Sequence, residues 1–127
     1  MRTLLVGLVS ASLVVASGEL LVGQSRSPRV TGIFTDMHYI TDVGDLLGTE
    51  VFIVGGGNGY KAIVQIAQGS PGDPVVVPVT VKGNDVSFEL PPTYHNLKFS
   101  GRVSTQALTG NLGSERVALR RRNSYWQ

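Results

Sequence analysis

The chain has 127 residues, of which 42% are apolar and 16% charged, and it contains 16 glycines, 6 prolines and no cysteine. This composition excludes a disordered chain of the highly charged type, and the length allows one domain with a single core. The formal net charge of +2 is too small to predict nucleic acid as a partner. Without cysteine the chain has no disulfide, no thiol nucleophile and no lipid-modified cysteine.

The N-terminal residues have the pattern of a secretory signal peptide. Arg2 supplies a positive charge, residues 4–15 form an uncharged and mostly apolar run, and small residues at 16–18 precede Glu19. A membrane-spanning helix needs about 20 apolar residues, and Glu19 interrupts this run earlier. The pattern predicts a signal peptide at residues 1–18, an exported chain in the periplasm or outside the cell, and no membrane span after cleavage. A retained membrane anchor is the alternative.

Residues 19–28 are predicted to be a flexible leader, and residues 29–127 a single folded domain. Within that domain, short runs rich in Val, Ile, Thr, Phe and Tyr alternate with turn signals, which is typical of β-strands. The eight runs are residues 30–35, 49–54, 60–68, 75–82, 86–90, 97–104, 106–112 and 115–122. They predict an all-β fold, an antiparallel up-and-down meander of about eight strands forming a small barrel, with a compact β-sandwich as the alternative.

Apolar and polar residues alternate with a period of two in four consecutive runs between residues 60 and 104, as in strands with one buried face. In the run 75–82, Val77 and Val79 share one face and Pro78 lies on the other. Because proline lacks a backbone N–H, Pro78 predicts an unpaired edge or a bulge at its position.

Glycines mark two further features. Gly101 and Gly110 lie inside predicted strands and indicate sharp bends or bulges of the kind that small barrels need. The sequence GGGNG at residues 55–59 resembles a phosphate-binding loop, but a β-patterned run follows it instead of a helix. Asn-Gly is a strong hairpin signal, so this loop is predicted to be a hairpin turn, and no cofactor is expected.

Four residues near position 40 combine carboxylates with an imidazole, a set that can bind a divalent cation: Asp36, His38, Asp42 and Asp45. Their spacing matches no EF-hand loop and no zinc motif, so they are weak candidates and no metal is predicted. The alternative is a polar loop in which Asp42 and Asp45 cap turns while Gly44 and Gly48 adopt positive φ.

Catalytic motifs are scarce. The chain has two histidines, His38 and His95, and no Gly-x-Ser-x-Gly elbow. An enzyme is therefore not favoured. The one catalytic hypothesis is a small enzyme that uses His38 with Asp36 or Asp45.

The C-terminal end is both basic and aromatic. Arg120, Arg122, Tyr125 and Trp126 are predicted to form an interaction strip for an anionic ligand or a protein partner. In the alternative, the aromatic pair packs over one end of the barrel while the arginines at 120–122 alternate between inward and outward positions. Outer-membrane barrels can also end in aromatic residues, but they need strands of about 9–11 residues, and most runs here are shorter.

The C-terminal third of the chain resembles the closing strands of calycin-type barrels, the group that includes lipocalins and avidins. Phe99 and Gly101 match the Phe-x-Gly strand of that group, and Leu108 and Gly110 match its Leu-x-Gly strand. The lipocalin Gly-x-Trp motif is absent, so the resemblance implies a barrel but no ligand-binding residues. The chain is also similar to small secreted bacterial proteins that end in Ser-Tyr-Trp-Gln, as residues 124–127 do.

Three functions follow, in order of preference. The first is a secreted or periplasmic, non-enzymatic binding module that holds a small apolar or amphipathic ligand inside the barrel. Its predicted ligand-binding residues are Tyr60, Val64, Val77, Val79, Phe88 and Phe99. The second is a structural or interaction domain of the cell envelope, such as an inhibitor or accessory protein, that binds an envelope protein through the interaction strip. The third is the small enzyme.

Overall fold

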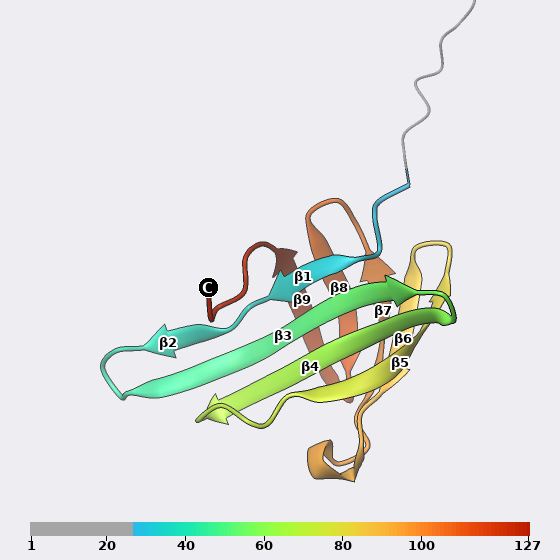
Figure 1. Ribbon diagram of the computed structural model, residues 1–127. Helices are drawn as coiled ribbons and strands as arrows, with labels where there is room; N and C mark the ends of the chain where they lie inside the picture. Colours follow the sequence, from blue (N-terminus) through green and yellow to red (C-terminus); the bar gives the residue numbers. More distant parts are fainter. Residues whose placement is uncertain (1–26) are drawn as a thin grey trace, which may run out of the picture.

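The computed structural model describes residues 27–127, so the predicted signal peptide and most of the predicted leader lie outside the described residues. Figure 1 shows the strands and the one short 3-10 helix of the described part. In chain order the elements are β1 (Gly32–Thr35), β2 (His38–Ile40), β3 (Asp45–Gly56), β4 (Gly59–Gly69), β5 (Val75–Lys82), β6 (Asp85–Glu89), the 3-10 helix (Pro92–Tyr94), β7 (Lys98–Val103), β8 (Ala107–Leu112) and β9 (Glu115–Arg121). No helix in this part of the chain is long and apolar enough to cross a membrane.

The strands form a closed antiparallel barrel. Each strand from β3 to β8 pairs with the next one along the chain, and β1 pairs with both β9 and β3, which closes the ring. Eight strands make up the barrel, and β2 is an additional strand that pairs with β3. The predicted all-β class and the up-and-down meander of eight strands are confirmed, and the fold is the barrel and not the sandwich.

The eight predicted runs correspond in order to β1 and β3 to β9. The interpretation of residues 36–48 as a polar loop is wrong in part, because β2 and the first residues of β3 lie there. Asp42 does lie in the turn between these strands, whereas Asp45 begins β3. The strand pattern is hard to recognise in this segment because β2 has only 3 residues and glycine interrupts the first half of β3.

The chain bends between β1 and β2 opposite Gly48. Residues 45–47 of β3 pair with β2, and residues 50–53 pair with β1. Asp36 secures this bend twice: its N–H donates to the carbonyl of Thr49 at 3.2 Å, and its Oδ1 accepts the N–H of Thr49 at 2.7 Å. Gly48 has a φ of 118°, and a Cβ there would lie 2.7 Å from the Cα of Met37. Only glycine allows the two backbones to approach so closely with this φ.

Replacing Asp36 with alanine is expected to lower the free energy of unfolding by about 1–2 kcal/mol, because the part-buried Thr49 N–H loses its acceptor. Urea denaturation measures the change. Asp42→Ala, in the exposed turn, is the control and is expected to change the stability by less than about 0.5 kcal/mol. Equal effects of the two substitutions would contradict the role assigned to Asp36.

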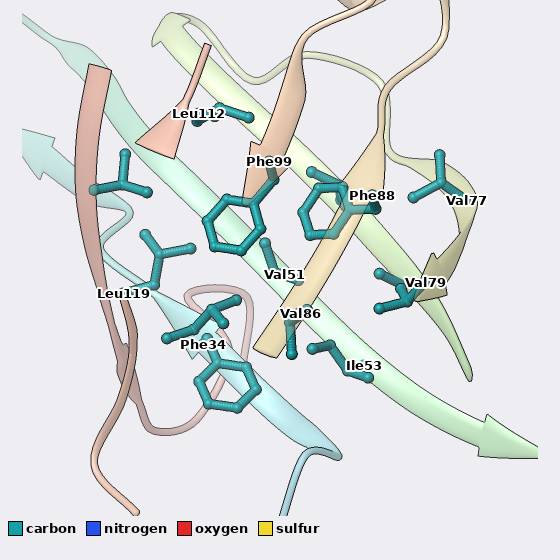
Figure 2. Close-up of a cluster of buried hydrophobic side chains, with 14 of the residues drawn as sticks. Phe34, Val51, Ile53, Val77, Val79, Val86, Phe88, Phe99, Leu112 and Leu119 are labelled. Atoms are coloured by element: carbon teal, nitrogen blue, oxygen red, sulfur yellow. The ribbon is translucent and has the colours of Figure 1, made fainter. Parts of the chain in front are cut away.

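Alternate residues of the barrel strands point inward and form one packed core. Figure 2 shows labelled side chains from opposite sides of the barrel converging, such as Phe34 from β1 and Phe99 from β7. Phe88 and Phe99 stand opposite each other on β6 and β7, and their rings are stacked with centroids 4.9 Å apart. The interior is therefore filled by apolar side chains in close contact.

Two local predictions are confirmed. The loop at residues 55–59 is the β3–β4 hairpin, in which Gly56 pairs with Gly59 across two turn residues. Pro78 lies beside an unpaired edge, because β6 pairs only with residues 80–82 of β5. The barrel closes in spite of Pro78, since the missing N–H can face this open edge.

Candidate functional site

Five of the six predicted interior residues belong to the packed core: Val64, Val77, Val79, Phe88 and Phe99. Tyr60 differs, because it lies near the start of β4 beside Gly55 and is 37% exposed. The main hollows of the described residues open on the outer surface, and none is lined by the five core side chains. An interior ligand stays a prediction, and the outer surface is where the geometry offers a site.

The weak metal candidates are not brought together. Within residues 27–127, no group of three or more His, Asp or Glu side chains could hold a metal ion. The carboxylate of Asp36 accepts the N–H of Thr49. The Nδ1 of His38 lies 2.8 Å from the backbone carbonyl oxygen of Asp36, so the contact between these two residues does not involve the carboxylate. The polar side chains of this segment therefore take part in the bend between β1 and β2.

The predicted interaction strip is divided into two parts. Arg120 and Arg122 line a hollow at the open end of the β8–β9 hairpin, where β8 begins and β9 ends, together with residues 105–107. Tyr125 and Trp126 lie over β3 and β4 instead, where they bond to side chains of those strands. The aromatic half of the strip and the basic half thus face different surroundings.

Arg121, between the two basic residues of the strip, turns toward the barrel end. Its guanidinium donates to the backbone carbonyls of Thr31, Arg29 and Ser104, and its Cζ lies 4.6 Å from the centroid of the Phe34 ring. Burial and, to a smaller extent, the charge of Arg29 lower the pKa of Arg121 from its ordinary value. Arg121 lies on the same side of β9 as the buried Val117 and Leu119, in agreement with the expected alternation of the arginines.

An apolar row crosses the outside of the barrel from β1 to β5. Ile33 stands opposite Phe52, Phe52 opposite Ile63, and Ile63 opposite Val76. Residues directly opposite in antiparallel strands share a face, so these four side chains are neighbours. Phe52, Ile63 and Val76 are exposed. A contiguous exposed apolar surface of this kind marks a binding surface.

The C-terminal tail adds a tryptophan to this row. Glu50 and Gln65 stand opposite each other on β3 and β4, beside the row. The Glu50 carboxylate accepts the Ser124 hydroxyl and the Tyr125 N–H, the latter at 2.8 Å. The indole N–H of Trp126 donates to Oε1 of Gln65 at 2.7 Å, and its backbone N–H donates to the Ser124 hydroxyl at 3.2 Å. Side chains of the barrel therefore fix the position of the tail.

The row and the tail together form a surface that we call the aromatic face: Ile33, Phe52, Ile63, Val76, Tyr125 and Trp126. A groove of about 440 Å³ runs between the tail and the row. Trp126 lines it and is 56% exposed, and Tyr125 stands edge-on to Trp126 with ring centroids 5.1 Å apart. The aromatic face offers large apolar side chains beside fixed polar groups.

Sequence reasoning identified Tyr125 and Trp126 but missed the barrel residues of this face. The signal was present, since Ile63 lies between Lys61 and Gln65 on the polar side of its strand. An apolar residue on the polar phase of an alternating strand indicates an outward apolar position. The positions of Glu50 and Gln65 beneath the tail depend on contacts more than 60 residues apart in the chain, which no local pattern contains.

Comparisons of the chain with protein-family models, with curated proteins and with solved structures gave no match. The feature that the chain shares with calycin-type proteins is the small, closed, antiparallel barrel of eight strands.

Proposed function

We propose that this chain is a non-enzymatic binding module that binds a partner protein through the aromatic face. The observation that carries the proposal is the position of Trp126, which is 56% exposed and yet held by hydrogen bonds from both its indole and its backbone. Tryptophan is enriched among the residues that dominate binding energy at protein interfaces. A side chain that is already fixed loses little conformational entropy on binding.

A protein partner fits the aromatic face better than a small ligand does. Small-molecule sites usually enclose most of their ligand, whereas the groove beside Trp126 is open to solvent. The apolar row extends from β1 to β5, so a broad surface is needed to cover it. Since the N-terminal sequence predicts export, we propose a partner in the cell envelope or outside the cell, with an apolar patch of its own.

Replacing Trp126 with alanine is expected to abolish the complex while leaving the barrel folded, because the tail lies outside the core. The measurement is sedimentation velocity of the labelled chain in the exported fraction of its native host and, separately, of the purified chain. The wild type is expected to sediment in a larger complex in the host fraction and as a monomer when purified.

Tyr39→Ala is the matched control, because Tyr39 is an aromatic residue of β2 with a similar exposure of 54%. This variant should retain the complex. The partner identified after cross-linking should bind the purified wild type, and Trp126→Ala should weaken that binding at least about tenfold, as expected for an interface residue of this kind. Three results would overturn the proposal: a monomeric wild type in both the host fraction and the purified sample, an equal loss of the complex in Trp126→Ala and Tyr39→Ala, or self-association of the purified chain.

A further inference from the structure

A second outer surface, on the strands β5 to β9, has the opposite character to the aromatic face. One row of directly opposed residues crosses all five strands: Thr80, Ser87, Ser100, Asn111 and Arg116. A neighbouring row runs parallel to it: Lys82, Asp85, Arg102 and Thr109. We call these two rows the polar groove.

The polar groove is hollow because the sheet bends beneath it. Gly101 and Gly110 stand opposite each other on β7 and β8, and both occupy positions at which a side chain would face the barrel interior. A Cβ on Gly101 would lie 2.9 Å from the Cα of Gly110, so the absence of two side chains lets the strands approach and bend inward. The outer surface above them forms a hollow of about 650 Å³.

The charges in the polar groove favour an anion. Its side chains include three cations, Lys82, Arg102 and Arg116, and one carboxylate, Asp85. The single ion pair within residues 27–127 joins Arg102 Nε to Asp85 Oδ1 at 3.1 Å. Lys82 and Arg116 make no ion pair there, so the groove has an excess of two positive charges.

The remaining side chains of the groove define the ligand further. Hydroxyl and amide groups separate the cations, and each can both donate and accept hydrogen bonds. With strands about 4.8 Å apart, a row across five strands extends over about 19 Å, which suits a chain molecule better than a single ion. Proteins that bind single-stranded nucleic acids stack the bases on aromatic side chains. The lining of the groove contains no aromatic side chain, which argues against a single-stranded nucleic acid as the ligand.

From this charge, length and hydrogen-bonding pattern we infer that the polar groove binds an acidic oligosaccharide. The carboxylates of the sugar would meet Lys82 and Arg116, which lie in different rows, and the sugar hydroxyls would meet Thr80, Ser100 and Asn111. This inference is independent of the proposed function, because the polar groove and the aromatic face are formed by different residues.

Isothermal titration with hexagalacturonate tests the inference, with neutral maltohexaose as the uncharged probe. We expect hexagalacturonate to bind with a Kd below about 1 mM at low salt and more weakly at 0.5 M salt, because salt screens exposed charges. Maltohexaose should bind at least about tenfold more weakly. Equal binding of the two sugars, or no binding of hexagalacturonate, would overturn the inference.

Variants locate the site. Lys82→Gln and Arg116→Gln should each weaken hexagalacturonate binding about two- to fivefold, the range expected for one exposed charge contact. Lys61→Gln removes the same charge from β4, outside the groove, and should leave the Kd unchanged. Asp85→Asn should tighten binding, because it removes the only carboxylate of the groove and frees Arg102.

An equal loss of binding in Lys61→Gln would mean that the sugar responds to net charge alone, which would overturn the inference. Tighter binding of inorganic polyphosphate or of oligothymidylate than of hexagalacturonate would overturn the assignment to sugars. Circular dichroism of each variant ensures that a change in binding is not a loss of fold.

Discussion

Replacing Gly101 with alanine is expected to lower the free energy of unfolding by about 3 kcal/mol or more. A Cβ at this position would lie 2.6 Å from the Cζ of Phe99 and 2.9 Å from the Cα of Gly110, and it would overlap the carbonyl oxygen of Thr109. Backbone atoms of the paired strand β8 cannot move away without breaking the β7–β8 ladder. The expected result is a domain that is mostly unfolded, or one with a much lower midpoint in urea.

Gly57→Ala is the control for the Gly101 prediction. Gly57 lies in the β3–β4 turn, and no atom lies within 4 Å of a Cβ built there. Its substitution is expected to change the stability by less than about 0.5 kcal/mol. Similar urea midpoints for Gly101→Ala and the wild type would show that the sheet can relax at this point, which would contradict the explanation for the bend.

Replacing Arg121 with methionine is expected to cost about 2–3 kcal/mol, or a fall in Tm of about 10–20 °C. The guanidinium holds the backbone before β1 to the end of β9 through the carbonyl oxygens of Arg29 and Thr31. It also donates to the carbonyl of Ser104 in the β7–β8 loop and covers the ring of Phe34. Methionine keeps much of the apolar contact but donates no hydrogen bond. Because β1 pairs with only two residues of β9, this closing contact of the barrel depends strongly on Arg121.

Arg120→Met is the matched control, since Arg120 is the exposed neighbour on the same strand. It should leave the Tm within about 2–3 °C of the wild-type value. Hydrogen exchange gives a second measurement. Relative to the wild type, Arg121→Met should accelerate the exchange of the amides of β1 and β9 more than that of the amides of β4. Equal stability of the two arginine variants would show that the carbonyls find other donors and that the cation does not hold the barrel end.

Because the inward side chains pack against one another, both binding proposals concern the outer surface of the barrel, and an interior ligand stays a prediction. In the lipocalin-like hypothesis the inward side chains line a ligand cavity, but here they pack against one another, as the stacked rings of Phe88 and Phe99 illustrate. The outer surface instead carries two contrasting regions, an apolar one over β1, β3, β4 and the start of β5 and a polar one over β5 to β9. Both proposals can be tested separately, because neither set of variants alters the other surface.

The all-β class and the order of the strands along the chain follow from local sequence patterns. Alternation with a period of two is a property of each strand alone, so Val77, Val79 and Phe88 could be assigned to the core without any partner. The β3–β4 hairpin was predictable for the same reason, because its turn residues are adjacent in the chain. Strand β2 escaped prediction because 3 residues are too few to establish a period.

The closure of the barrel and the grouping of its outer residues depend on contacts between distant segments, which no local pattern contains. The pairing of β1 with both β3 and β9, and the bonds from Glu50 and Gln65 to the tail, join segments distant in sequence. The direction of Trp126 likewise depends on partners that the chain supplies only after β3 and β4 have paired. Local patterns determine which side of a strand is buried, whereas the composition of an outer surface depends on the register between strands.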